Sequence, residues 1–273
     1  MGESARKLKD RFKLDKHELE DVLLQIRSQF TPSDLVRKLG IEGLLGHMSV
    51  LSDSAILRHQ AAGNIVISPY NESNLSTSSY DVTLGDNYFR EREPQGKCTI
   101  LNPYDEKKVR SIWQLCKAKT LHQERTSRDL TLDDIGENIS DKDKVIMIRP
   151  KSMVLAHTTE YIGGKNIVTT MMKARSTWGR NFIEVCKCAG WGDVGYTNRW
   201  TMEITNNSEH YTIPLVVGRR IAQIVFFEVD PILEKDYTGN GKYQKGRHLA
   251  DLKRTWTPDA MLPKMWLDRE VRK

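Results

Sequence analysis

Cysteine is scarce in this chain of 273 residues, which contains only Cys98, Cys116, Cys186 and Cys188. Four cysteines in so long a chain do not make a disulfide scaffold, so we expect a reducing, cytoplasmic environment. No apolar run approaches the roughly 20 residues that a membrane span needs, which excludes a transmembrane helix. The start of the chain has no apolar core of the signal-peptide kind, so we do not expect secretion.

Several nucleotide-binding and catalytic signatures are also absent. The chain has no Walker A loop, no Rossmann fingerprint and no G-x-S-x-G elbow. The zinc-deaminase signature, H-x-E followed by P-C-x-x-C, is missing as well. Cys186-Lys187-Cys188 is only half a zinc site, because no second Cys/His pair accompanies it. We therefore expect no zinc, and we interpret these two cysteines as buried structural thiols.

The net charge of +6 raises the question of nucleic acid. Residues 233–273 carry ten Lys and Arg against six Asp and Glu, so most of the excess lies near the C-terminus. There is no polybasic block and no RNA-recognition or zinc-finger signature. A modest positive segment suits a small polyanion such as a nucleoside triphosphate at least as well as a duplex. We do not expect nucleic-acid binding.

The hydrophobic pattern changes along the chain. Residues 5–30 have apolar side chains at helical spacing, and Thr31-Pro32 is typical of the start of a second, shorter helix. We interpret residues 1–48 as a helical extension that serves packing or assembly more readily than catalysis. Ser52-Asp53 predicts the cap of a short helix that runs to about Ala62 and ends at Gly63.

Short β-branched runs separated by turn residues follow, and they favour an all-β barrel or sandwich. A polar excursion at residues 104–143 interrupts them, with a helical piece expected near Ser111–Leu121. A further helical stretch is expected around Pro258–Arg272. The predicted strands are Asn64–Ser68, Tyr80–Leu84, Val145–Ile148, Met153–Thr158, Asn166–Thr170, Arg199–Asn206, Tyr211–Pro214 and Arg220–Val229.

Two segments carry polar groups that could serve chemistry. In Arg175-Ser176-Thr177-Trp178-Gly179-Arg180, hydroxyls next to arginines offer donors to an anion, although such a stretch is more often an ordinary solvated turn. In the predicted strand 199–206, Glu203 lies on the polar face. It is either a solvent-facing strand residue or a partly desolvated general base. Glycines bracket Asp193 nearby, and a turn of this composition often lets the backbone approach a ligand.

Six segments taken together resemble the dCTP deaminase family. Any one of them is a weak signal, but they occur in unbroken order over about residues 49–246. They are VLSDSAILRHQAAGNIVISPY, SSYDVTLGDNYF, IRPKSMVLAHTTEYI, ARSTWGR with Asp193 and Glu203 at the family's spacing, VVGRRIAQIVFFEV, and Tyr237 with GKYQ.

The resemblance implies a mainly β fold, the distorted β-barrel of the trimeric dUTPases (of β-clip or jelly-roll type), with the α-helical N-terminal extension and short helices added. Its domain covers residues 49–247, and residues 248–273 form a C-terminal tail with a short helix. The resemblance also implies a homotrimer with active sites shared between subunits. It further implies deamination of dCTP without zinc, with Mg²⁺ carried by the substrate triphosphate.

The resemblance also implies roles for individual residues. Glu203 matches the base that takes a proton from the water attacking C4, and Ser176 and Arg180 match residues that hold this water and the pyrimidine edge. The backbone of Ala189 matches a carbonyl that positions the same water, and Asp193 matches the residue beside the deoxyribose. The other nucleotide-binding positions implied are Arg175, Thr177, Thr201, Met202, Tyr237, Lys242 and Gln244.

Some positions depart from the family pattern, and alternatives remain open. Gly246 stands where a second C-terminal glutamine is expected, and Thr197-Asn198-Arg199 stands where the family commonly has glycine. The leading interpretation is a deaminase that converts dCTP to dUTP and ammonia. The alternatives are a bifunctional enzyme that forms dUMP, a dUTP pyrophosphatase on the same barrel, and a non-catalytic nucleotide-binding regulator.

Overall fold

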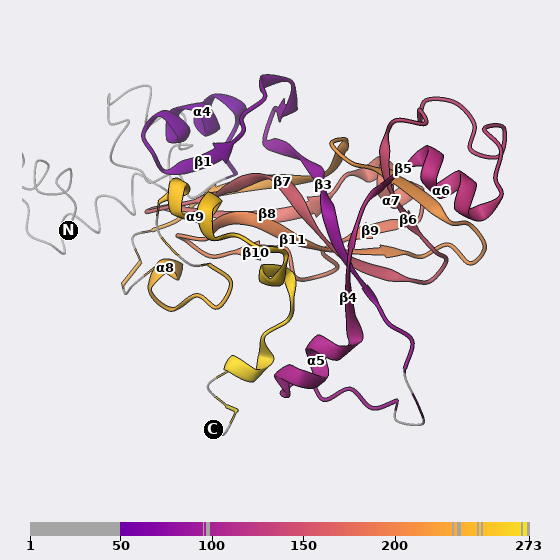
Figure 1. Ribbon diagram of the computed structural model, residues 1–273. Helices are drawn as coiled ribbons and strands as arrows, with labels where there is room; N and C mark the ends of the chain where they lie inside the picture. The colour runs from indigo at the N-terminus through magenta and orange to yellow at the C-terminus, as the bar shows by residue number, and fades with distance from the viewer. Residues whose placement is uncertain are drawn as a thin grey trace, which may run out of the picture. The chain divides into compact units, whose positions relative to one another are not determined.

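The computed structural model describes residues 50–271, apart from residues 95, 97, 98, 231, 234, 235, 245, 247 and 269. The chain divides into two compact units, residues 1–49 with 228–230 and residues 50–227 with 231–273. The helices expected within residues 5–48 lie outside the described residues. All that follows concerns the second unit (Figure 1).

The described elements are mostly strands, which confirms the mainly β fold class. The strands are β1 (Ile65–Ser68), β2 (Leu75–Ser76), β3 (Ser79–Glu91), β4 (Trp113–Lys117), β5 (Lys119–Thr120), β6 (Lys144–Ile148), β7 (Met153–Gly164), β8 (Val168–Ala174), β9 (Ile183–Val185), β10 (Trp191–Gly192), β11 (Thr197–Asn206), β12 (Ile213–Val216) and β13 (Arg220–Glu228). The helices are α4 (Asp53–Ala61), α5 (Glu106–Ile112), α6 (Leu121–Arg128), α7 (Ser176–Arg180), α8 (Tyr237–Asn240) and α9 (Leu249–Thr255), with 3₁₀ turns at Glu72–Asn74, Pro258–Met261 and Met265–Leu267.

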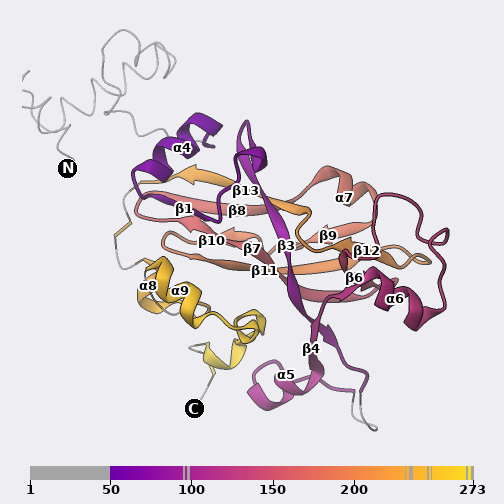
Figure 2. The same ribbon diagram turned by 45° about the horizontal axis from the view of Figure 1, so that its top comes forward.

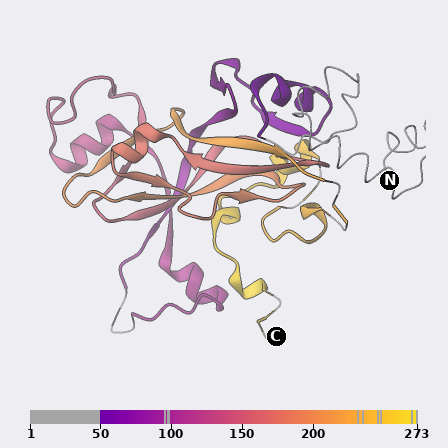
Figure 3. The same ribbon diagram turned by 180° about the vertical axis from the view of Figure 1, so that it is seen from behind.

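Strand β3 joins the two halves of the main sheet. Its first part pairs antiparallel with β13, and its later part pairs with β4 on one side and β7 on the other. The order along the sheet, among the described strands, is β10-β8-β13-β3-β7-β11-β9. A small second sheet has the order β12-β6-β5. The strands run side by side in Figure 2, and the β3–β4 hairpin with α5 projects away from them in Figure 3.

The core lies between the inward faces of these strands. Tyr80, Phe226, Met202 and Ile204 are fully buried there. Burying each such side chain contributes about 1.5–3 kcal/mol, so this apolar face holds the sheet in register. Strand β7 is central to the arrangement because β1, β3 and β11 all pair with it.

Local signals placed several elements correctly. Helix α4 begins after Ser52, whose side chain accepts a hydrogen bond from the amide of Ala55, and it ends before Gly63. Each predicted strand overlaps a strand of the structure, although β3 and β7 are much longer than expected. Long-range pairing extends them, since the ends of both strands find partners far away in the sequence.

The excursion at residues 104–143 is organised differently from the prediction. The expected helix at Ser111–Leu121 is wrong: α5 ends at Ile112, and β4 follows at once. In β4, Cys116 pairs with Tyr88 and Gln114 pairs with Arg90 of β3, so the ladder of a distant strand overrides the local helical preference.

The expected C-terminal helix is also mostly replaced. Residues 258–267 form two short 3₁₀ turns, whereas the α-helix of this region is α9, which comes before them. Pro258 begins the first turn, and Pro263 separates it from the second. Prolines so closely spaced prevent a continuous helix. Within the described residues, no helix is long and apolar enough to span a membrane.

Candidate active site

Glu203 lies on the outer face of β11. Along this strand Trp200, Met202 and Ile204 are buried in the core, while Thr201 and Glu203 on the opposite face are half-buried. Burial raises the pKa of the Glu203 carboxyl above its usual value, and the positive charge of Lys187 opposes that rise. Glu203 is therefore partly desolvated, as one of the two alternatives predicts, and a desolvated carboxylate is a stronger base than a solvated one; its role as a general base stays a prediction.

A tight turn brings residues 186–189 beside this strand. The amide of Cys186 donates a 3.0 Å hydrogen bond to the carbonyl of Glu203. Cys186 and Lys187 both have positive φ angles, and the amide of Ala189 donates to the carbonyl of Cys186 at 2.7 Å. This turn places Ala189 at the surface next to β11, the strand that carries Glu203.

The two neighbouring thiols have different environments. Cys186 is buried, with its Sγ 3.0 Å from the Sδ of Met172, and burial raises its pKa. The prediction of a buried structural thiol is therefore right for Cys186. It is wrong for Cys188, which is exposed because the chain turns here instead of continuing as a strand.

Asp193 is held at the surface by a rigid turn between β10 and β11. The carbonyl of Gly192 accepts hydrogen bonds from the hydroxyls of Thr169 and Thr170. A Cβ atom at Gly192 would lie 2.4 Å from the Trp200 ring, so only glycine fits there. The backbone of this glycine-rich turn was expected to approach a ligand closely, but at Gly192 it approaches the protein's own core instead. The Asp193 side chain is exposed.

Tyr196 belongs to this site, although the sequence analysis did not single it out. Its ring contacts Trp200 and Tyr237 edge to face, with centroids 5.2 and 5.1 Å apart. Burial raises the pKa of its hydroxyl, and Glu203 is among the charged groups that act on it. The amide of Tyr196 donates to the carbonyl of Asp193 at 3.0 Å, so Tyr196 links the Asp193 turn to β11. The sequence feature that could have pointed to Tyr196 is its position as an aromatic residue directly after Gly195.

The segment after residue 235 packs against the same turn. The amide of Tyr237 donates to the carbonyl of Val194 at 2.9 Å, and α8 lies near β10 and β11 in Figures 1 and 2. The buried Gln244 side chain accepts from the amide of Thr197 at 2.7 Å and donates to the carbonyl of Gly195 at 3.2 Å. Its amide is therefore engaged with the backbone of the turn.

Two other predicted nucleotide contacts have their own partners or positions in the fold. Exposed Lys242 forms an ion pair with Asp268, and its neighbour Tyr243 is tied to β11, because the side chain of Asn198 donates a 2.9 Å hydrogen bond to the Tyr243 carbonyl. Met202 is fully buried in the core, and its backbone pairs with Ala156 of β7, so this chain offers no exposed surface of Met202 to a ligand. Thr201 shares the half-buried face of Glu203, as the alternation along the strand predicts.

The Ser176–Arg180 segment forms a second group of polar side chains. It is the short helix α7, on which Ser176, Thr177 and Arg180 are exposed. The indole of Trp178 anchors it by donating to the carbonyl of Arg220 at 3.0 Å. A cleft of about 500 Å³ lies beside it.

Arginines dominate that cleft. Arg175, Arg219 and Arg220 line it together with Thr177. The buried Asp81 carboxylate lies 3.3 Å from Nε of Arg175 and 3.2 Å from a terminal nitrogen of Arg220. Arg219 pairs with a second carboxylate, that of Asp143, at 3.3 Å. Three arginines against two carboxylates leave an excess of positive charge, which suits a phosphate group.

The predicted site residues thus fall into two groups. In the first group, Glu203 lies on β11 beside the 186–189 turn that carries Ala189, and Tyr237 packs on the β10–β11 turn that carries Asp193. The second group, Arg175–Arg180, lies around α7. Within the described residues, no hydrogen bond or ion pair joins the two groups. Nor does any group of three or more His, Cys, Asp or Glu side chains among them have the arrangement of a metal site.

Comparison with known proteins identifies the family. The family model for dCTP deaminase-like proteins matches residues 50–229. This chain belongs to that family. The resemblance predicted from the sequence motifs is confirmed, and with it the assignment of the chain to a family of enzymes.

Two curated relatives carry the name "dCTP deaminase, dUMP-forming". The one from Hydrogenobaculum sp. is 31% identical over 185 residues, covering 67% of this chain and 84% of the relative. The one from Aquifex aeolicus is 30% identical over 199 residues, covering 72% and 91%. A solved 2'-deoxycytidine 5'-triphosphate deaminase from Agrobacterium tumefaciens is similar to 66% of this chain and 48% of its own length, at 16% identity and a TM-score of 0.45. This chain thus spans about half the length of that solved protein.

Proposed function

We propose that this enzyme converts dCTP to dUMP, ammonia and pyrophosphate, consuming two molecules of water. The observation that carries the proposal is the half-buried carboxylate of Glu203 beside the turn that presents Asp193. The names of the two relatives support dUMP as the product, so they favour the bifunctional alternative over the release of dUTP.

In the proposed deamination, Glu203 takes a proton from a water molecule that attacks C4 of the cytosine. The carbonyl of Ala189 orients this water, because the 186–189 turn is tied to the backbone of Glu203. Glu203 then returns the proton to the leaving amine, so that the C4–N bond breaks and ammonia departs. The raised pKa of this carboxyl suits both transfers.

In the proposed second step, another water attacks the α-phosphorus, the bond to the β-phosphate breaks, and pyrophosphate leaves. Asp193 is exposed on its rigid turn and is the carboxylate placed to orient that water. Mg²⁺ enters with the triphosphate as part of the substrate. The described residues offer donors for the phosphates, from Arg175, Thr177 and Arg220, but no cage of carboxylates for the ion.

We further propose a homotrimer in which each site takes Glu203 from one subunit and the Ser176–Arg180 helix from another. The lack of any hydrogen bond or ion pair between the two groups, within the described residues, supports this arrangement. The exposed side chains of Ser176 and Arg180 form no hydrogen bond or ion pair with the described residues of their own chain. In the proposed trimer, a neighbouring copy of the chain would supply the face of β11 that carries Glu203.

A product assay tests the function directly. The full chain is incubated with dCTP and Mg²⁺, and dUTP, dUMP, pyrophosphate and ammonia are separated and quantified. We expect dUMP, pyrophosphate and ammonia in equal amounts. Accumulation of dUTP and ammonia without pyrophosphate would remove the second step, and unchanged dCTP would remove the whole proposal. Added dUTP serves as a separate substrate that isolates the second step.

A further inference from the structure

A second, larger cleft is lined by none of the residues of the candidate active site. It has a volume of about 820 Å³ and opens between the β3–β4 hairpin, helix α6 and the β6–β7 turn. Its floor contains Tyr88 and Arg90 of β3, which pair with Cys116 and Gln114 of β4. Small-molecule sites occupy about 300–1,000 Å³, so the cleft has the size of a ligand site.

The lining of this cleft is mainly basic. Six cationic side chains face three carboxylates, those of Glu91, Glu93 and Glu124. The six cations are Arg90, Arg92, Lys117, Lys119, Arg128 and Arg149.

Only part of that positive charge is compensated. Nε of Arg128 lies 3.2 Å from the carboxylate of Glu124, and Lys117 lies 3.6 Å from Asp86. In the described part of the chain, Arg92, Lys119 and Arg149 form no ion pair. Like charges gathered in one concavity repel each other, and a bound anion would relieve this repulsion.

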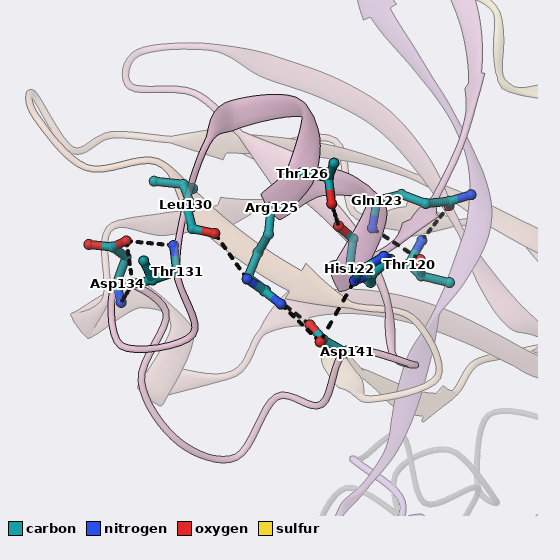
Figure 4. Close-up of polar contacts among 9 residues, drawn as sticks. All are labelled: Thr120, His122, Gln123, Arg125, Thr126, Leu130, Thr131, Asp134 and Asp141. Atoms are coloured by element: carbon teal, nitrogen blue, oxygen red, sulfur yellow. Dashed lines mark hydrogen bonds and ion pairs between the residues drawn. The ribbon is translucent and has the colours of Figure 1, made fainter.

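Helix α6, which forms one wall, is held firmly in place (Figure 4). Its first turn has a capping box in which the side chains of Thr120 and Gln123 each accept from the other's backbone amide. Behind the helix, the guanidinium of Arg125 donates two hydrogen bonds to Asp141, at 3.0 and 2.9 Å, and a third to the carbonyl of Leu130. A wall fixed in this way loses little entropy when a ligand binds.

The floor offers donors that are already oriented. Arg90 lines the cleft, and its Nε donates to the side chain of Gln114 at 3.0 Å, which orients the guanidinium. Burial raises the pKa of Tyr88 to about 12, so its hydroxyl keeps its proton. A planar guanidinium beside further cations matches the oxygens of a phosphate group.

We propose that this cleft binds the phosphate chain of a small oligophosphate-bearing molecule, such as a nucleoside triphosphate, at a site separate from Glu203. Residues of the polar excursion, which the proposed reaction does not use, build one wall of the cleft and, together with β3, its floor. A concavity enclosed by a hairpin, a helix and a turn favours a small ligand. A nucleic-acid strand would need an extended basic stripe.

Two cysteines allow the two sites to be followed in one experiment. Cys116 lines the cleft, whereas Cys188 is exposed beside Ala189 in the candidate active site. The full chain is alkylated with neutral iodoacetamide at increasing concentrations of inorganic tripolyphosphate or ATP, and mass spectrometry gives the rate at each cysteine. We expect saturable protection of Cys116 by either probe. The midpoint is the probe concentration that gives half of the full protection. Equal midpoints for the two probes would show that the phosphates alone determine the affinity, and a lower midpoint for ATP would show that the nucleoside also contributes.

Charge-reversal variants test whether the basic lining is responsible. Arg92→Glu and Arg149→Glu should each raise the midpoint for Cys116 by about tenfold or more, while the midpoint at Cys188 stays unchanged. Arg58→Glu is the matched control, because it makes the same charge change on exposed helix α4 and should alter neither midpoint. Arg149→Gln, with thermal unfolding measured for each variant, separates loss of binding from loss of folding.

Three results would overturn the proposal. The first is protection of Cys188 without protection of Cys116, since oligophosphate would then bind the active site alone. The second is unchanged protection of Cys116 in both glutamate variants. The third is protection of Cys116 by a single-stranded RNA oligonucleotide but not by tripolyphosphate or ATP, which would make the cleft part of a nucleic-acid surface.

Discussion

The ring of Tyr237 meets the ring of Tyr196 edge to face, with centroids 5.1 Å apart. This contact joins the C-terminal segment to the turn that presents Asp193. On its other edge Tyr196 contacts Trp200, which precedes Glu203 by three residues in β11. The proposed base, the acidic turn and the C-terminal segment therefore share one aromatic support. The predictions below test what this arrangement does.

Replacing the proposed base should abolish turnover while leaving the fold and substrate binding intact. For Glu203→Gln we expect the rate of ammonia release from dCTP to fall by about 10²–10⁴-fold, the usual loss when a general base is removed. The dCTP dissociation constant should stay near that of the wild type. Glu184→Gln is the control, because Glu184 is exposed on the neighbouring strand β9. Activity of Glu203→Gln within tenfold of the wild type would contradict the assignment.

The acid limb of the pH–rate profile should lie above the ordinary pKa of a glutamate. Glu203 must be ionised to act as a base, and burial raises its pKa. As the pH falls through this raised value, kcat/KM for deamination should therefore decline. Removing the charge of Lys187, which lowers that pKa, should move the limb to higher pH in Lys187→Met.

The control for this shift is Lys253→Met, a change of equal charge on helix α9. It should leave the limb where it is in the wild type. A Lys187→Met profile that coincides with the wild type, or that moves to lower pH, would show that Glu203 does not control the limb.

Inactive subunits should complement each other if the sites are shared. We expect Glu203→Gln and Arg180→Ala chains, each inactive alone, to recover part of the activity after they are unfolded together and refolded as mixed trimers. Some of the sites would then combine an intact Glu203 with an intact Arg180. Light scattering of the wild type gives the oligomeric state. An active, monodisperse monomer of about the 31.4 kDa chain mass would contradict the trimer.

Removal of zinc should leave the reaction unchanged. The proposed chemistry uses Glu203 in place of a metal-bound hydroxide, and the zinc-deaminase signature is absent from the sequence. We expect full activity after dialysis against a zinc-selective chelator, once Mg²⁺ is restored for the triphosphate. Elemental analysis runs beside the assay. A stoichiometric zinc whose removal stops turnover would refute the mechanism.

Stability should fall on acidification because of His157. This histidine is buried and its pKa is lowered to about 4, chiefly by desolvation. Nearby Arg199 lowers it further, while Asp86 and the hydrogen bond to the Thr158 carbonyl oppose the shift. Between pH 6.5 and 4 the unfolded state binds the additional proton, so stability is lost as the pH falls. The full contribution is on the order of 3 kcal/mol.

Two measurements check this contribution. NMR titration should give the low pKa of the imidazole directly, and urea unfolding should show the loss of stability toward pH 4. Buried Glu160 has a raised pKa and acts in the opposite direction, so the comparison needs His157→Asn, which keeps Glu160. Equal slopes of stability against pH in the variant and the wild type would contradict the prediction.

Much of the site was predictable because its signals are local. The alternation of Trp200, Met202 and Ile204 with polar neighbours predicts which face of the strand carries Glu203, since side chains alternate along any strand. The Ser52 cap predicts the start of α4 for the same reason, as its partner lies three residues away. The order of the motifs predicts the family.

Other features depended on residues far away in the sequence. The segment at 113–117 has the composition of a helix, but its pairing with β3, as between Cys116 and Tyr88, makes it a strand. Cys188 was expected to be buried with Cys186, yet the positive φ angles at 186 and 187 turn it outward. Tyr196 joined the site only because Tyr237, some forty residues later, packs on it.

The sequence by itself determined the strand faces, the helix cap and the mainly β class, because spacing along the chain controls each of these, while the order of its motifs indicated the family. The tertiary structure alone decided how far Glu203 is desolvated and that the Gln244 side chain is engaged by the backbone of the β10–β11 turn, at Gly195 and Thr197. Burial and long-range pairing set these outcomes, and both are sums over contacts between residues that no local pattern connects.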